Sequence, residues 1–234
     1  LREASSLAEK ISYTRGRAIT QKLFGNVWYD YNQFDKALEY YNISHAIWKT
    51  TGDKMELAKI ISNIGNVYGM KGEYQKCLEY FLISLKIDEE IKNIKGIAST
   101  SGNIGELYVF QQNNELALHY HRKSLALYKD LNYVKGIARA LNNIGMVYNL
   151  MHNTDSSLIY MTESVLLSEK SQDKTALVNS YGNISRVYTD LGQHQKSIEY
   201  LLKTLQLVSS MGSKYAAGIS CIDIAKNYLV LKQY

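Results

Sequence analysis

Apolar residues recur along this chain at intervals of three and four, the spacing that places them on one side of an α-helix. In residues 56–68 these positions are Leu57, Ile60, Ile61, Ile64, Val67 and Tyr68. Lys71 and Gly72 follow, and glycine readily adopts the left-handed conformation that ends a helix. The same spacing returns in residues 74–91, after which Asn93 can cap the next helix. The pattern predicts an antiparallel pair of helices joined by a short loop.

This pair is repeated every 40 residues without an insertion. One column of equivalent positions holds Tyr40, Tyr80, Tyr120, Tyr160 and Tyr200. Another holds Phe24, Ile64, Ile104, Ile144, Ile184 and Ile224, and the next position holds Gly25, Gly65, Gly105, Gly145, Ser185 and Ala225. Several columns in one register are typical of a solenoid in which each unit packs on its neighbours.

The repeated residues have a structural interpretation. Glycine inside a helix costs about 1 kcal/mol relative to alanine, so the glycine column predicts points where two helix backbones approach closely. The tyrosines are expected to be packing residues, because a cofactor or nucleotide site would not recur in every unit. A column of small hydroxyl residues is expected to bond the preceding turn of its own helix: Ser44, Ser84, Ser124, Ser164 and Thr204.

Two short motifs carry a family resemblance. Ile64-Gly65-x-x-Tyr68, followed by Cys77-x-x-x-Phe81, resembles the consensus of the tetratricopeptide repeat. The period is 40 rather than the usual 34, and proline is absent, as in the long-repeat subfamily; this favours lengthened second helices. The resemblance covers the whole chain and implies an all-α, right-handed solenoid, or superhelix, of antiparallel helix pairs.

A single array over residues 1–234 is therefore expected. Residues 1–13 would form the second helix of a preceding repeat, and residues 216–234 the first helix of a sixth. Five full repeats would lie between them, at residues 16–53, 56–93, 96–133, 136–173 and 176–213. Because such an array begins and ends inside a repeat, apolar faces are expected at both ends, and the chain is expected to be a segment of a longer protein.

Composition narrows the function classes. The net charge is +5, but Lys and Arg alternate with Asp and Glu, which favours solvated faces over a nucleic-acid surface. No run of 18 apolar residues predicts a membrane span. Cys77 and Cys221 lie too far apart along an array for a disulfide, and Cys77 is expected to be buried. No metal-ligand spacing, phosphate loop or nucleophile–base pair is found, so we expect no enzyme, metal site or cofactor.

Recognition is the better supported function. In tetratricopeptide arrays the first helices line the concave groove, so the resemblance implies that partner contacts flank the Ile–Gly pair. Before the isoleucine stand Asn63, Asn103, Asn143, Asn183 and Asp223, and one turn earlier stand Lys59, Ser99, Arg139 and Asn179. After the glycine stand Asn26, Asn66, Glu106, Met146, Arg186 and Lys226.

These two columns differ in how much they vary. A constant asparagine column can bond the main chain of an extended peptide, whereas the varied column would select its side chains. The alternative is that the asparagines bond the adjacent repeat and stabilise the stack.

The predicted function is a non-catalytic protein- or peptide-interaction module. Repeated phrases such as Gly-Ile-Ala are similar to the sensory region of bacterial two-component histidine kinases or of repeat-bearing transcription regulators. The alternatives are a cytoplasmic peptide-binding adaptor of the spindle-orientation type and a scaffold that dimerises through its end helices at Leu7, Ile11 and Leu229. The compartment would be periplasmic for the sensory region of a membrane kinase and cytoplasmic otherwise.

Overall fold

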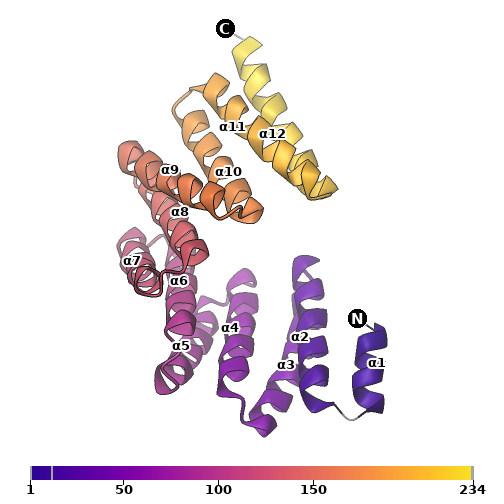
Figure 1. Cartoon of the computed structure of the whole chain (residues 1–234). Coiled ribbons are helices and arrows are strands. Elements are labelled where there is room, and N and C mark those ends of the chain that lie inside the picture. The colour runs from indigo at the N-terminus through magenta and orange to yellow at the C-terminus, as the bar shows by residue number, and fades with distance from the viewer. Residues whose placement is uncertain (1, 12, 233–234) are drawn as a thin grey trace. The chain divides into compact units, whose positions relative to one another are not determined.

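The computed structural model describes residues 2–11 and 13–232, and over these residues it contains helices and turns but no strand. Leu1, Ser12 and residues 233–234, which belong to the predicted terminal helices, lie outside the described residues. The chain divides into two compact units, residues 1–111 and 112–234. Each is described by itself (Figure 1).

Unit 1 begins with the short helix α1 and continues with alternating first and second helices. Its helices are α1 (Arg2–Lys10), α2 (Thr14–Asp30), α3 (Phe34–Thr51), α4 (Lys54–Met70), α5 (Tyr74–Glu90) and α6 (Ile94–Phe110). The second helix α3 packs on the first helices α2 and α4, and α5 packs on α4 and α6 in the same way. Consecutive helices run antiparallel (Figure 1).

Unit 2 repeats this arrangement. Its helices are α7 (Asn114–Asp130), α8 (Val134–Leu150), α9 (Thr154–Lys170), α10 (Lys174–Asp190), α11 (His194–Ser210) and α12 (Lys214–Lys232). The second helix α9 packs on the first helices α8 and α10, and α11 packs on α10 and α12. The predicted all-α fold of helix pairs is confirmed.

The helices from α2 onward begin every 20 residues, so the 40-residue repeat consists of two halves of equal length. Both α4 and α5 contain 17 residues. The predicted lengthening is therefore not confined to the second helices, because first and second helices are equally long. The first helix of the second repeat begins at Lys54, two residues before Glu56, because the Asp53 side chain caps it by accepting a hydrogen bond from the Glu56 amide. The predicted cap at Asn93 is confirmed by its bond from the Gly96 amide at 3.2 Å.

Each turn from α2 to α12 contains one residue in the left-handed conformation, again at intervals of 20. Glycine occupies four of these ten positions: Gly52, Gly72, Gly192 and Gly212. The predicted turn at Gly72 is confirmed by its φ of 77°. The other six positions hold Asn32, Lys92, Gln112, Asn132, His152 and Gln172. Their left-handed φ comes from the closing hydrogen bonds of the helix end, such as the bond from the Lys92 amide to the Glu89 carbonyl.

The glycine column lies where first and second helices meet. A Cβ on Gly65 would lie 2.9 Å from the Phe81 ring of α5. A Cβ on Gly145 would lie 2.7 Å from Met161 Cγ and 3.0 Å from the backbone oxygen of Ser157 on α9. Both are closer than ordinary van der Waals contact, which confirms in each unit the predicted close approach.

Tyrosines beside these contacts stack in pairs. Tyr80 stacks on Tyr68 with ring centroids 5.3 Å apart, and Tyr160 stacks on Tyr148 at 5.4 Å. Each pair joins the first and second helices of one repeat. Offset stacking adds about 0.5–1.5 kcal/mol to simple burial, so these tyrosines are packing residues, as predicted.

The hydroxyl column corrects one expectation. Ser84 donates a hydrogen bond to the backbone carbonyl of Ala58 at 2.9 Å, and Ser164 donates to Ala138 at 2.7 Å. The acceptors lie on the first helix of the same repeat, not in the preceding turn of the serine's own helix. The predicted local bond is found for Thr204, which donates to the Tyr200 carbonyl at 3.0 Å. Because the helices approach so closely, the buried serine reaches across to its partner.

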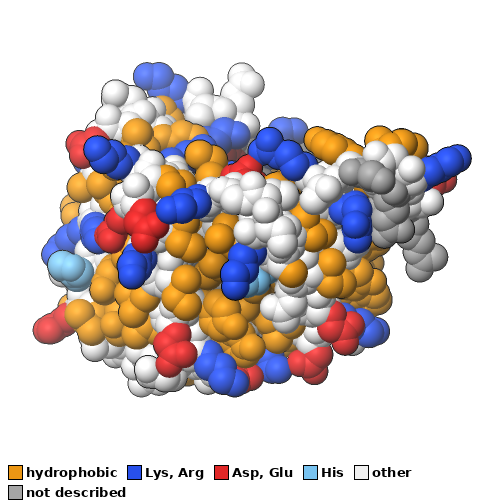
Figure 2. All heavy atoms as spheres, turned by 90° about the horizontal axis from the view of Figure 1, so that it is seen from below, with side chains coloured by type: hydrophobic (Ala, Val, Ile, Leu, Met, Phe, Trp, Pro, Cys, Tyr) orange, Lys and Arg blue, Asp and Glu red, His pale blue; other side chains and the backbone are white. Residues whose placement is uncertain are grey.

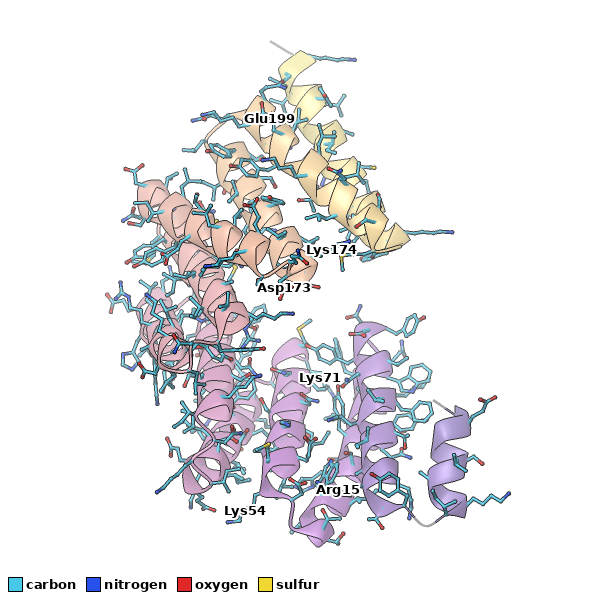
Figure 3. The ribbon with its side chains drawn as sticks, in the orientation of Figure 1. Arg15, Lys54, Lys71, Asp173, Lys174 and Glu199 are labelled. Atoms are coloured by element: carbon cyan, nitrogen blue, oxygen red, sulfur yellow. The ribbon has the colours of Figure 1, made fainter. Side chains whose placement is uncertain are left out.

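Ion pairs join helices at both of their ends in unit 1: two link neighbouring repeats, and one, Lys54–Glu90, links the two helices of one repeat. They are Arg15–Asp53, Lys54–Glu90 and Lys71–Asp35, whose lysines and arginine are labelled in Figure 3. In unit 2, Lys135 and Asp173 occupy the positions equivalent to Arg15 and Asp53 and approach to 3.5 Å. Pairs with such exposed members contribute at most about 1 kcal/mol each, so packing provides most of the stability.

The two cysteines are free. Cys77 is buried, as predicted, and burial raises the pKa of its thiol to about 11. Cys221 is exposed on α12. In the described part of the chain, no helix combines the length and apolar character of a membrane span.

Candidate partner-binding face

The residues that flank the Ile–Gly pair lie on the first helices and turn away from the second helices. Because Gly65 faces α5, the residues two before it and one after it point about 200° and about 100° away around α4. These are Asn63 and Asn66, and both are half-buried. We name the predicted positions of each unit separately. The unit 1 face comprises Asn26, Lys59, Asn63, Asn66, Asn103 and Glu106; the unit 2 face comprises Arg139, Asn143, Met146, Asn179, Asn183, Arg186, Asp223 and Lys226.

The lysine of the unit 1 face belongs to a network of three charged side chains. Lys59 donates to one oxygen of the Glu56 carboxylate at 2.6 Å, and Lys22 of α2 donates to the other oxygen at 3.0 Å. Burial acts to raise the pKa of Glu56, but the hydrogen bonds from Lys59 and Lys22 outweigh it and lower the pKa overall. The carboxylate therefore stays ionised at neutral pH and compensates much of the charge of both lysines.

Two amides of the unit 1 face are used inside the protein. Asn26 accepts a hydrogen bond from the Tyr41 hydroxyl at 2.8 Å. Burial, and then the nearby Tyr29 and Asp30, raise the pKa of Tyr41, so its hydroxyl remains a donor. Asn103 donates its amide to the Ser62 hydroxyl of α4 at 3.1 Å.

The other two amides are available. Within the described residues, the side chains of Asn63 and Asn66 make no hydrogen bond with the protein. They lie three residues apart on α4 and are therefore neighbours on its surface. The unit 1 face thus offers two adjacent amides, and the charge of its lysine is compensated by Glu56.

The asparagine contact of unit 1 recurs in unit 2. Asn183 donates to the side-chain oxygen of Asn142 at 3.2 Å, across the same 41-residue separation that joins Asn103 to Ser62. In both units the amide reaches the first helix of the preceding repeat. These bonds give Asn103 and Asn183 the stack-stabilising contacts of the alternative interpretation. Asn143 is buried.

Unit 2 differs in its charged positions. Arg139 donates to the Tyr128 hydroxyl at 3.1 Å. Arg186 and Asn179 are exposed on α10 and form no ion pair or hydrogen bond within the part of the chain that is described. Met146 is half-buried and packs against the apolar cluster of unit 2. Arg186 is a permanently charged fork of donors and is left uncompensated on this face.

At the end of the unit 2 face, the side chains are engaged locally. Lys226 pairs with Asp223, three residues before it, at 3.1 Å. Behind them lies Asn227, which is buried and whose side-chain oxygen approaches His194 Nδ1 to 2.8 Å. Sequence reasoning missed this polar contact. The sequence signal is that Asn227 stands in a column of apolar residues, which holds Val67, Leu107, Val147 and Val187 in other repeats.

A buried histidine was also given no role by sequence reasoning. His121 on α7 is fully buried, and neither ring nitrogen has a hydrogen-bond partner among the described residues. Burial, and then Arg139, lower its pKa to about 4. The signal was again a polar residue in an apolar column, which holds Tyr41, Phe81, Met161 and Leu201.

The chemistry of both faces suits recognition. Among the described residues, no three His, Cys, Asp or Glu side chains gather so that they could hold a metal ion. On the surface shown in Figure 2, Lys and Arg are scattered among acidic and apolar side chains. Amides, one free guanidinium and a methionine can bond a polypeptide by hydrogen bonds, an ion pair and apolar contact.

Comparison with solved structures identifies the same fold in other proteins. BtubC (BKLC) from P. vanneervenii superposes with a TM-score of 0.69 at 19% identity, covering 92% of this chain and 89% of that one. A signal transduction ATPase with numerous domains from Pyrococcus horikoshii, which has a tetratricopeptide repeat sensor, superposes with a TM-score of 0.73 at 17% identity. The match covers 97% of this chain and 34% of that one. A Rap protein complexed with competence and sporulation factor superposes with a TM-score of 0.66 at 12% identity, covering 96% of this chain and 66% of that one.

These identities are low enough that the structures show the fold alone. This chain spans about a third of the Pyrococcus horikoshii protein, and no curated protein matches its sequence. A family profile described as tetratricopeptide repeat, however, matches residues 56–130 and 136–210, which is more than half of the chain. The chain belongs to the tetratricopeptide repeat family.

Proposed function

We propose that this chain is a protein- or peptide-binding module in which the unit 1 face and the unit 2 face are each a binding surface for an extended segment. The observation that carries the proposal is the set of unengaged polar side chains on the first helices. They are Asn63, Asn66, Asn179 and Arg186.

The amides of the unit 1 face suit the partner's main chain. A carboxamide has two donors and one acceptor oxygen, which match the carbonyl and N–H groups of an extended strand. Asn63 and Asn66 stand side by side on α4, so together they can bond both kinds of backbone group. Main-chain bonding contributes affinity and little sequence preference.

The unit 2 face suits an acidic group. Arg186 presents a planar fork that bonds a carboxylate through two parallel hydrogen bonds. Asn179 lies seven residues earlier on α10, two turns along the same side of the helix. Met146 on α8 offers a half-buried, adaptable apolar surface. We expect the selected segment to carry a carboxylate, from Asp, Glu or a chain terminus.

The finer context is also a proposal. We favour the sensory or regulatory region of a larger signal-transduction protein, such as a histidine kinase or a transcription regulator. The neighbour with a tetratricopeptide repeat sensor and the Rap protein bound to competence and sporulation factor support this context by fold. A cytoplasmic peptide-binding adaptor is the second candidate, supported by the free amides of α4, which any extended segment can use.

A peptide library tests the binding role. Replacing both Asn63 and Asn66 with alanine should weaken all bound peptides alike, by about 0.5–1.5 kcal/mol for each bond lost. Arg186→Glu should instead change which peptides bind, from acidic to basic ones, because like charges repel. Lys123→Glu, at an exposed position of the second helix α7, is the matched charge-reversal control. Unchanged binding by both folded face variants would contradict the proposal.

A further inference from the structure

A stripe of polar side chains runs along one side of α4. Its members follow one another at intervals of three, four and three residues, which places them side by side along the helix. They are Glu56, Lys59, Asn63 and Asn66. A carboxylate and a lysine bonded to it therefore lie on the same side of α4 as the two available amides of the unit 1 face.

Glu56 differs from its counterparts in the other repeats. The equivalent positions hold only small, uncharged residues: Gly16, Gly96, Gly136, Ala176 and Ala216. Packing of the helices therefore requires neither a long side chain nor a carboxylate at this position. The carboxylate is a feature of α4 and not of the repeat.

The Glu56 side chain is directed at two cations. Asp53 caps α4, and a glutamate three residues after such a cap commonly bonds back to the amide of the cap residue. Here one oxygen of Glu56 accepts a bond from Lys59 at 2.6 Å and the other accepts a bond from Lys22 at 3.0 Å. The side chains of Lys22 and Glu56 are 22% and 21% exposed. Water and salt therefore screen this pair less than a fully exposed one.

We infer that Glu56 determines which segments the unit 1 face accepts, and that it selects segments without charge. An acidic segment finds both lysines already paired and brings its own carboxylate next to that of Glu56, where like charges repel. A basic segment meets two ammonium groups beside the amides. A neutral segment can bond Asn63 and Asn66 without either cost. The inference rests on the proposed binding at the unit 1 face and adds the charge class of the bound segment.

A peptide library tests this inference in a chain whose unit 2 cation has been removed by Arg186→Gln. Each acidic peptide is paired with a neutral twin in which Asn and Gln replace Asp and Glu. Adding Glu56→Gln should raise the affinity for acidic peptides about three- to fivefold, the size of an exposed ion pair. The affinity for the neutral twins should change less than twofold. Glu56→Ala, which installs the residue found at position 176, should give the same gain.

Two further variants show where the gain comes from. Lys59→Gln, added to the Glu56→Gln chain, should remove most of the gain, because the released lysine provides it. Glu73→Gln is the matched control: Glu73 is bonded to Lys76 at 2.6 Å, but it lies at the start of the second helix α5. This change should alter neither affinity. Circular dichroism checks that each variant is folded.

The outcomes separate this inference from the proposed function. If Glu56→Gln and Glu56→Ala left the affinity for acidic peptides unchanged, the inference would be overturned. The proposed function would still stand if the neutral peptides lost affinity when Asn63 and Asn66 were both replaced with alanine. If neither the parent chain nor the Glu56 variants bound any peptide, both would be overturned.

Discussion

Unit 1 and unit 2 share a frame but differ in the charges that their faces leave uncompensated. Both have helices that begin every 20 residues, left-handed turn residues at the same interval and close glycine contacts between first and second helices. On the unit 1 face, Lys59 is bound to Glu56, which also holds Lys22. On the unit 2 face, Arg186 is exposed and unengaged within the described residues.

This difference shows that the repeat determines where the face residues lie, whereas individual residues determine which of them can bind a partner. The positions of the face residues follow from the helix geometry and from the glycine contact that orients each first helix. Which of them remain available for a partner depends on single residues elsewhere, such as Glu56 in unit 1. A repeat protein can therefore change its specificity without changing its backbone, and the predictions below examine both sides of that contrast.

The largest expected difference concerns pH and lies in unit 2. His121 occupies the position that Phe81 fills in unit 1, and its pKa of about 4 is below the ordinary 6.5 that it regains on unfolding. Between these values the unfolded chain binds more protons, so the free energy of unfolding should fall as pH drops from about 6.5 to about 4. This pKa difference corresponds to roughly 3 kcal/mol in the free energy of unfolding. That contribution is present in full above pH 6.5 and is lost as the pH falls to about 4.

His121→Phe should remove this dependence. Urea unfolding of the parent and the variant at pH 7 and pH 4.5 should show a much smaller loss of stability in the variant. Phe is the matched replacement because Phe81 already occupies the equivalent place. Equal losses in the two proteins would show that His121 is not the group that titrates.

Filling a glycine contact should destabilise the helix packing that both units share. Gly145→Leu places a side chain against Met161 and the Ser157 backbone, which should cost about 2 kcal/mol or more through overpacking. Gly182, on the neighbouring first helix α10, has no atom within 4 Å of an added Cβ. Gly182→Ala should therefore stabilise the helix by several tenths of a kcal/mol, up to about 1 kcal/mol. Thermal unfolding of both variants measures the contrast, and a neutral Gly145→Leu would refute the close contact.

A smaller difference between the units should appear in the serine column. Ser84→Ala removes one bond to the Ala58 carbonyl and should cost about 1 kcal/mol. Ser164→Ala removes the bond to Ala138 and also the contact with the Ser180 hydroxyl at 2.9 Å. It should cost roughly 1.5 kcal/mol, because a second buried hydroxyl loses its partner. Chemical denaturation would measure both, and equal costs would mean that Ser180 finds another acceptor.

The frame could be predicted from the sequence because it rests on periodic patterns. The 40-residue register gave the helix pairs, and Gly65 and Gly145 marked the close contacts. The equal 20-residue halves were missed, because the left-handed turn residue is a glycine in only some turns. Lys92 and Gln172 adopt the same φ without any glycine signal.

It was harder to predict which face residues form bonds inside the protein and which remain available. Lys59 and Arg186 both read as exposed cations, but the partner of Lys59 is held in place by Lys22, 34 residues from Glu56. Likewise, Asn63 and Asn103 are the same residue type in one column, although Asn103 bonds Ser62 whereas Asn63 has no bond within the described residues. Such pairings depend on three-dimensional neighbours that differ from repeat to repeat, and no column pattern encodes them.

The most direct measurement compares one neutralised cation in each unit. For a bound peptide that carries a carboxylate, Arg186→Gln should weaken affinity about three- to fivefold, which corresponds to an exposed ion pair of roughly 0.5–1 kcal/mol. Lys59→Gln should change affinity less than twofold, because its charge is already held by Glu56. Isothermal titration calorimetry with the parent and both variants gives the three affinities. Equal losses, or a larger loss for Lys59→Gln, would contradict the account that unit 2 carries the available cation.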